Sequence, residues 1–133
     1  MFNFDHIAIS AENLEETLSF YYKFGFVLYK EYHDENIDIV MLEFNSVFLE
    51  IFHYNENFDL PEHSKELLID LKTIGNKHFG LRVKDINEAK QWIEDKNLNN
   101  SEIKINKGRL GRNYFFIKDP NGILMEIIED PEI

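Results

Sequence analysis

Apolar and polar residues alternate at the start of the chain, which is the pattern of a β-strand. In residues 4–10 the isoleucines fall on one face and His6 falls on the other. The spacing then becomes helical from Asn13 to Phe24, and Glu16, three residues after Asn13, completes the form of a capping box. This pattern predicts a strand followed by a helix.

Three segments rich in β-branched and aromatic residues follow this helix. They are Phe26–His33, Ile37–Phe44 and Val47–Tyr54, with the polar breaks Asp34-Glu35-Asn36 and Asn45-Ser46 between them. Breaks of this length are typical of β-hairpins. The first half of the chain is therefore predicted to be β-α-β-β-β.

The second half repeats this plan after a polar stretch, residues 55–76, in which we expect a short helical piece at Ser64–Lys72. His78 is followed seven residues later by Asp85, just as His6 is followed seven residues later by Asn13. A helix is predicted at about Asp85–Asp95. The predicted strands after it are Ser101–Asn106, Asn113–Lys118 and Ile123–Ile128, the last preceded by the turn Asp119-Pro120-Asn121-Gly122.

This internal repeat predicts an α+β fold built from two β-α-β-β-β modules. A supersecondary unit of this size cannot bury its own apolar face, so duplicated units are expected to associate about a pseudo-twofold axis. The length of 133 residues suits one domain. We therefore expect a single domain over 1–133, made of repeats at about 1–54 and 76–130.

The charge balance limits the classes of molecule that the protein is expected to bind. Its 25 acidic and 14 basic side chains give a net charge of −11, which disfavours nucleic acid and anionic membrane surfaces. The chain has no cysteine, so disulfides, thiolate metal sites and cysteine nucleophiles are excluded. It has no positively charged leader, and no apolar run approaches the ~20 residues of a membrane helix. We expect a cytoplasmic protein that acts on a small molecule.

Two carboxylates interrupt otherwise apolar strands at matching places in the repeat. Glu50 lies in the segment 47–52 and Glu126 in the segment 123–128, and each strand follows a histidine strand, that of His6 or His78. A buried carboxylate without a partner is costly, so such positions favour pairing, metal binding or contact with water. His6, Glu50, His78 and Glu126 form an N/O donor set suited to one divalent ion, Ni²⁺, Zn²⁺, Co²⁺, Mn²⁺ or Fe²⁺.

The remaining histidines have no partner in the repeat. We assign His33, His53 and His63 to loops or strand ends. Glu43 also interrupts an apolar strand and is a candidate second catalytic carboxylate, although a solvent-facing position near the hairpin fits it better.

The two histidine strands, together with Asp119-Pro120-Asn121-Gly122 and Glu126 four residues further on, resemble the vicinal oxygen chelate superfamily, the glyoxalase, bleomycin resistance and extradiol dioxygenase group. The resemblance covers essentially the whole chain. It implies paired modules that form a cupped mixed sheet around a divalent ion, often in a homodimer. By position, His6, Glu50, His78 and Glu126 match the His/Glu/His/Glu ligand set of glyoxalase I.

This resemblance implies a metal-dependent lyase or isomerase of the lactoylglutathione lyase type, acting on the hemithioacetal of a 2-oxoaldehyde or a related 2-hydroxycarbonyl compound. Glu50 and Glu126 are then ligands, and one of them moves a proton between neighbouring carbons. Arg109, Arg112 and Tyr114 are candidate substrate-binding residues, the arginines for an anionic group. Ser10 and Tyr54 replace the Arg and Asn that are typical of members using glutathione.

Other functions remain open within the same superfamily. A non-catalytic binding protein for an antibiotic is one alternative, with an apolar pocket lined by aromatic side chains. A metal-dependent thiol transferase and an epimerase are two more, but the presence of Glu50 favours the glyoxalase I type. A fold alone does not select among these reactions.

Overall fold

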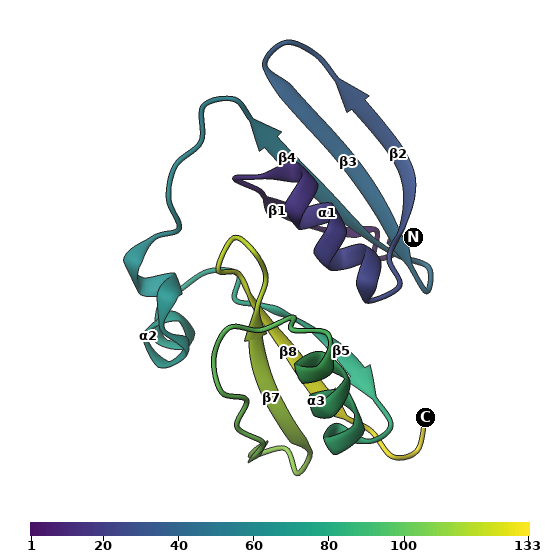
Figure 1. The fold of residues 1–133 in the computed structure, drawn as a ribbon, viewed down its shortest axis with the longest axis vertical. Helices are drawn as coiled ribbons and strands as arrows, with labels where there is room; N and C mark the ends of the chain where they lie inside the picture. Colours follow the sequence, from purple (N-terminus) through teal and green to yellow (C-terminus); the bar gives the residue numbers. More distant parts are fainter. The chain divides into compact units, whose positions relative to one another are not determined.

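The computed structural model describes residues 1–133, which divide into two units, Met1–Asp59 and Leu60–Ile133. Each unit holds a four-stranded mixed sheet and a ten-residue helix that lies along it (Figure 1). The α+β fold with two repeated modules is therefore confirmed.

The first unit has the β-α-β-β-β order predicted from the hydrophobic pattern. Its elements are β1 (His6–Ser10), α1 (Leu14–Lys23), β2 (Val27–His33), β3 (Ile37–Phe44) and β4 (Val47–Tyr54). The strand order is β1-β4-β3-β2. β1 runs parallel to β4 and the other pairs are antiparallel, so the hairpins are formed by β2, β3 and β4.

The second unit repeats this topology after a short helical connection. Its elements are η1 (Glu62–Lys65), α2 (Leu67–Lys72), β5 (Phe79–Val83), α3 (Ile86–Asp95), β6 (Asn106–Lys107), β7 (Asn113–Lys118) and β8 (Leu124–Glu129). The strand order is β5-β8-β7-β6, with β5 parallel to β8 and the other pairs antiparallel. The second module is thus the topological copy of the first.

One predicted strand is wrong in extent. Only Asn106 and Lys107 of this region pair with β7, and residues 101–105 are not in a strand, whereas the sequence predicts Ser101–Asn106. Ile103 is nevertheless buried. The alternation in this segment reflects a side chain packed into the core rather than a hydrogen-bonded ladder.

Side chains cap the two sheet-covering helices at the predicted places. Asn13 accepts a hydrogen bond from the backbone N–H of Glu16 at 2.9 Å, which starts α1. Asp85 accepts from the N–H groups of Asn87 and Glu88 at 2.8 and 3.0 Å, which starts α3. Each cap satisfies donors that the first helical turn leaves unpaired.

The two turns singled out by the sequence have the conformations that their residues favour. Asn45 and Ser46 join β3 to β4 with positive φ angles of 50° and 67°, which suits a two-residue hairpin. Between β7 and β8, the buried carboxylate of Asp119 accepts from the N–H groups of Asn121 and Ile123. Gly122 there has a φ of 82°, a value that glycine adopts without steric cost.

Each sheet has one face packed beneath its helix and one face that carries the polar candidates. The register aligns Ile9 with Ile51 and Val40 on the packed face of the first module. The packed face of the second module aligns Leu81 with Ile127 and Phe115. Because successive strand residues point to opposite faces, His6, Glu50 and Glu126 lie on the other side of their sheets.

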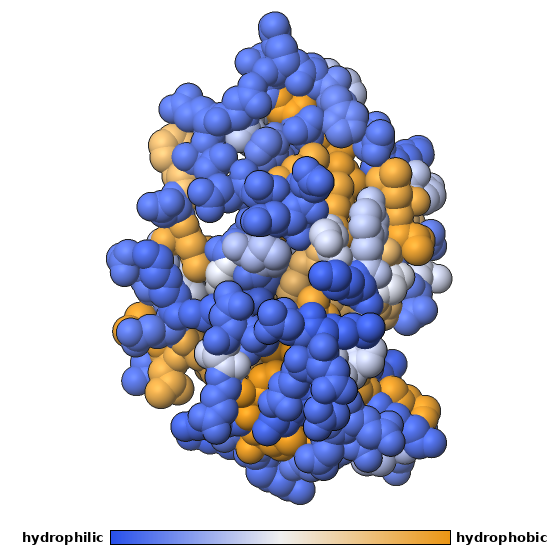
Figure 2. Space-filling model, viewed as in Figure 1, coloured by the Kyte–Doolittle hydropathy of each residue, from blue (hydrophilic) through white to orange (hydrophobic).

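The surface agrees with the composition. Hydrophilic residues cover most of the face seen in Figure 2, although several large apolar side chains along β2, among them Tyr29 and Tyr32, are exposed. The helices of this chain are all too short or too polar to cross a bilayer.

Candidate metal centre

The first module brings its predicted histidine and glutamate together. Ala8 is the register partner of Glu50, so His6, two residues earlier on β1, lies diagonally across from Glu50 on the same sheet face. The Nε2 atom of His6 is 3.5 Å from Oε1 of Glu50. The side chains are 38% and 21% exposed, which leaves the pair open to a ligand.

A neighbouring carboxylate holds the other side of the His6 ring. Nδ1 of His6 is 2.6 Å from Oδ2 of Asp5, the residue just before β1. This hydrogen bond is the main reason that the pKa of His6 is raised above its ordinary value, with partial burial opposing it and the charge of Glu50 adding to it. Asp5 was not predicted as part of the site, although its position next to His6 was visible in the sequence.

The second module repeats the diagonal arrangement. Gly80 is the register partner of Glu126, and His78 again stands two residues earlier. Nε2 of His78 is 3.1 Å from Oε2 of Glu126. In both modules the histidine stands two residues before the register partner of the glutamate, so the two pairs have the same place in their sheets.

The surroundings of the second pair differ from those of the first. The His78 ring meets Phe116 edge to face, with ring centroids 4.7 Å apart. Its Nδ1 atom is buried and has no hydrogen-bond partner. Just before His78, the Lys77 amine donates to backbone carbonyls at the end of α2 and lies 3.6 Å from the buried Asp70 carboxylate. His78 is thus positioned by packing and by its neighbour.

Both pairs have the spacing expected of two ligands of one metal ion. Two donors bound at about 2.1 Å with an angle between 90° and 109° lie about 3.0 to 3.4 Å apart. The observed separations of 3.5 and 3.1 Å are close to this range. Each pair supplies one imidazole nitrogen and one carboxylate oxygen, which suits borderline divalent metals.

The structure describes each of the four predicted ligands within its own module. Within either module it contains no cluster of three or more His, Asp or Glu side chains suited to a metal ion. It brings the residues together as two pairs, one in each module. The shared four-ligand centre therefore stays a prediction.

The candidate substrate-binding residues lie in the second module. Tyr114 is paired with Ile128 and meets Phe116 edge to face, which places it on the sheet face of Glu126. Nη1 of Arg112 is 3.9 Å from Oδ2 of Asp130. Arg109 is exposed in the turn before Arg112.

A second arginine joins Arg112 at the same carboxylate. Nη1 of Arg82 is 3.5 Å from Oδ2 of Asp130, and Arg82 lies on the face of Gly80 and Glu126. Two guanidinium groups therefore share one carboxylate at this end of the sheet. The sequence contained both arginines but gave no sign that Asp130 joins them.

Glu43 lies on the same face as Glu50 but away from the histidine. It is the register partner of Phe48, which in turn is the partner of His6. Two strand spacings of about 4.8 Å each separate Glu43 from His6, too far for both to bind one ion directly. Its half-buried side chain is therefore not part of the first pair.

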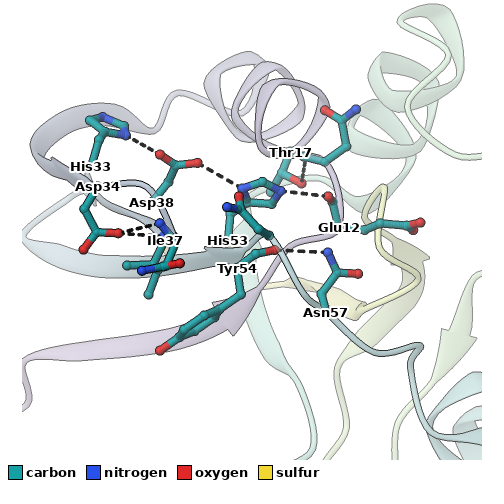
Figure 3. A network of polar contacts seen from close by, with 12 residues as sticks. Glu12, Thr17, His33, Asp34, Ile37, Asp38, His53, Tyr54 and Asn57 are labelled. Carbon is teal, nitrogen blue, oxygen red and sulfur yellow. Dashed lines mark hydrogen bonds and ion pairs between the residues drawn. The ribbon is translucent and has the colours of Figure 1, made fainter.

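The other histidines of the first module form a separate polar network on the helix side of the sheet (Figure 3). Asp38 at the start of β3 contacts His33 Nδ1 at 2.6 Å and His53 Nδ1 at 3.0 Å. His53 Nε2 also contacts the backbone carbonyl of Glu12 at 3.1 Å. His33 and His53 do lie at strand ends, as predicted, but this shared carboxylate was missed because it depends on the register of three strands.

Comparison with known proteins agrees with this fold and these motifs. Residues 5–116 match the family model of the glyoxalase/bleomycin resistance protein/dioxygenase superfamily. The chain therefore belongs to that family, the vicinal oxygen chelate superfamily. No curated protein sequence matches the chain.

Solved structures of this family are similar along the whole chain. A glyoxalase family protein from Enterococcus faecalis is 26% identical, with a TM-score of 0.76 over 93% of this chain and 94% of the other. A lactoylglutathione lyase from Agrobacterium tumefaciens is 19% identical, with a TM-score of 0.64 over 98% and 95%. A glyoxalase I mutant from Zea mays is 19% identical, with a TM-score of 0.71, but only 44% of that longer chain is covered, against 94% of this one.

Proposed function

We propose that the protein is a divalent-metal-dependent isomerase of the glyoxalase I type. The substrate would be the hemithioacetal of a small 2-oxoaldehyde and a thiol, or a related 2-hydroxycarbonyl compound. The observation that carries the proposal is the histidine–glutamate pair in each module, with donor separations of 3.5 and 3.1 Å. Membership of the family and the similarity to a lactoylglutathione lyase and a glyoxalase I support this reaction class.

In this proposal His6, Glu50, His78 and Glu126 hold one ion, and the two repeats act as one domain. The N/O donor set suits nickel, zinc, cobalt, manganese or iron. When bound, the ion supplies positive charge that stabilises the negative charge developing on two adjacent substrate oxygens. The close histidine–glutamate pair in each module supports this arrangement.

The proton transfer falls to a glutamate. One carboxylate, Glu50 or Glu126, removes the proton from the carbon that carries the hydroxyl and sulfur of the hemithioacetal. The same carboxylate returns that proton to the adjacent carbonyl carbon, while the hydroxyl proton moves to the former carbonyl oxygen, which gives a hydroxy thioester without net oxidation or reduction. Both carboxylates are 21% exposed, so each can meet a substrate on its sheet face.

The arginines of the second module give the substrate an anion-binding end. Arg82 and Arg112 share Asp130, so together they carry one more positive charge than that carboxylate neutralises. A substrate carboxylate can complete this cluster through charge-assisted hydrogen bonds. Tyr114 lies between this cluster and Glu126 on the same face, and Arg109 is available in the preceding turn.

A binding protein without catalysis is the second candidate function. Aromatic side chains Phe48 and Phe52 flank Glu50 on its sheet face and are half-buried, as in an apolar binding surface. Such a protein captures its ligand equally well after a chelator has removed all metal. The isomerase loses its turnover under the same treatment.

The test measures zinc content and affinity, and then turnover of methylglyoxal hemithioacetals of several thiols. The variants are His6→Ala, His78→Ala and Glu50→Gln, with His63→Ala and Glu43→Gln as matched controls. Wild type should hold about one ion per chain. Each of the three ligand variants should bind zinc more than about 100-fold more weakly than wild type. Loss of a residue that only supports a ligand costs up to about 100-fold, and each of these variants lacks a direct donor. The zinc affinity of the two control variants should stay within about twofold of that of wild type.

Two outcomes would contradict the proposal. Absence of binding of any of the five proposed metals at micromolar concentration would leave the binding protein as the better function. Retention of a tightly held ion after loss of either histidine would contradict the shared centre. The homodimer and the cytoplasmic location remain predictions from the resemblance and the composition.

A further inference from the structure

We infer that Asp5 is a positioning residue that sets the ring of His6 for metal binding, an inference that rests on the proposed function. Asp5 precedes β1 and its Oδ2 atom is 2.6 Å from Nδ1 of His6. It is 72% exposed and contacts the histidine rather than the position where an ion would bind. Its role would therefore be exerted through His6.

The chemistry of imidazole makes this contact selective for one tautomer. A neutral ring carries its proton on one nitrogen and a lone pair on the other. An ionised carboxylate only accepts hydrogen bonds, so Asp5 holds the proton on Nδ1. The lone pair then lies on Nε2, which is the nitrogen that faces Glu50 at 3.5 Å. The contact with Asp5 is the shorter of the two, 2.6 against 3.5 Å, so it favours the tautomer that a metal ion needs at that position.

His78 lacks an equivalent partner, although its module repeats the same fold. Its Nδ1 is buried without a hydrogen-bond partner, while Nε2 is 3.1 Å from Glu126. Without metal, a proton on Nε2 can be donated to that carboxylate. A metal bound at Nε2 moves this proton to Nδ1, where no acceptor waits. The two histidines are therefore unequal ligands, one preset by Asp5 and one that must change tautomer.

The test compares Asp5→Ala and Asp5→Asn with Asp59→Ala. The alanine removes the acceptor, the asparagine keeps a neutral acceptor oxygen, and Asp59→Ala removes an exposed acidic residue of the same module. Zinc affinity is measured by competition with a chelating indicator. We expect Asp5→Ala to bind zinc about tenfold more weakly, at the lower end of the range for outer partners because Asp5 is exposed. Asp5→Asn should fall between it and wild type, and Asp59→Ala should match wild type.

Nitrogen NMR of the metal-free protein supplies a second measurement that a loss of overall stability would not change. At a pH where the rings are neutral, His6 should carry its proton on Nδ1 in wild type and lose that preference in Asp5→Ala. His78 should carry its proton on Nε2 in both, which makes it an internal reference.

The two measurements separate this inference from the proposed function. If wild type binds none of the proposed metals, the proposed function fails, and the NMR spectrum still decides whether Asp5 sets the tautomer. A His6 ring protonated on Nε2 in wild type would overturn the inference. An Asp5→Ala protein with unchanged zinc affinity beside a wild type that binds zinc would also overturn it.

Discussion

The two modules place a histidine and a glutamate in the same diagonal geometry but fasten the histidine in different ways. In the first module, a carboxylate holds His6 through a hydrogen bond, and the side chain is 38% exposed. In the second, the His78 side chain is 18% exposed and meets the Phe116 ring edge to face, and its Nδ1 atom has no hydrogen-bond partner. The repeated topology therefore places a histidine–glutamate pair in both modules, while the side chains that hold the histidine differ between them.

This difference shows which kind of interaction orients each ring. A hydrogen bond fixes the tautomer as well as the direction of a ring, whereas packing restricts only the direction. Removing a packed neighbour should consequently affect His78 more than His6.

The largest effect is expected from Phe116. Phe116 and Met41 are the register partners of Glu126 and Glu50, so they occupy equivalent positions in the two modules. Phe116→Ala should lower the free energy of unfolding by about 2 to 3 kcal/mol, below the 3–5 kcal/mol typical of fully buried aromatics, because Phe116 is half-buried. It should also weaken zinc binding about tenfold, because His78 loses the ring that orients it.

Met41→Ala is the matched variant in the first module. It should also destabilise the protein, as measured by urea unfolding, but zinc affinity should stay within about twofold because Asp5 still holds His6. Equal losses of zinc affinity in Phe116→Ala and Met41→Ala would show that the two histidines are held alike.

The next effect is expected at the helix caps. Asp85 accepts two backbone N–H groups at the start of α3, whereas Asn13 accepts one at the start of α1. Asp85→Ala should cost about 1 to 2 kcal/mol of unfolding free energy and Asn13→Ala about 0.5 to 1 kcal/mol. Urea titration of both variants measures the difference. A larger cost at Asn13 would mean that the number of capped donors does not set the order.

The caps also show why much of the fold could be predicted. A capping side chain, a helical apolar spacing and a two-residue break such as Asn45-Ser46 act over a few neighbouring residues, so the sequence carries them directly. The internal repeat also made contacts between distant residues predictable, because equivalent strands place His6 beside Glu50 and His78 beside Glu126.

Where the predictions were wrong or incomplete, the cause is tertiary. Residues 101–105 alternate like a strand, but only Asn106 and Lys107 reach β7, and Ile103 is buried without joining a ladder. The contacts of Asp38 with His33 and His53, and of Asp130 with two arginines, depend on strand register and on side-chain directions. The hydrophobic pattern of the sequence specifies neither the register nor the side-chain directions.

The smallest effect concerns the Asp38 network, which has no counterpart in the second module. The hydrogen bond that His33 donates to Asp38 is the main cause that raises the pKa of His33, with partial burial opposing it and Glu31 adding to it. A raised histidine pKa stabilises the fold below the unfolded value of about 6.5 and is lost as the pH rises through the folded value. Stability from this contact should therefore fall as the pH rises above about 6.5.

The Asp38 carboxylate adds a second pH dependence to the same contact, at acid pH. Hydrogen bonds from His33 and His53 lower its pKa, so its contribution is present above about 3.9 and is lost as the pH falls through the folded value. Asp38→Asn should therefore reduce the difference in melting temperature of the metal-free protein between pH 6 and pH 8. The difference becomes smaller because protonated His33 no longer has a charged partner in this variant.

Asp34→Asn is the matched control in the same hairpin. The pKa of Asp34 is lowered mainly by the backbone N–H groups of Asn36 and Ile37, with Tyr32 adding to it, so Asp34 is ionised throughout pH 6 to pH 8. Asp34→Asn should lower the melting temperature by similar amounts at both pH values and leave the difference between them unchanged. If Asp38→Asn also leaves that difference unchanged, His33 does not stabilise the first module through its charge, and its contact with Asp38 is only geometric.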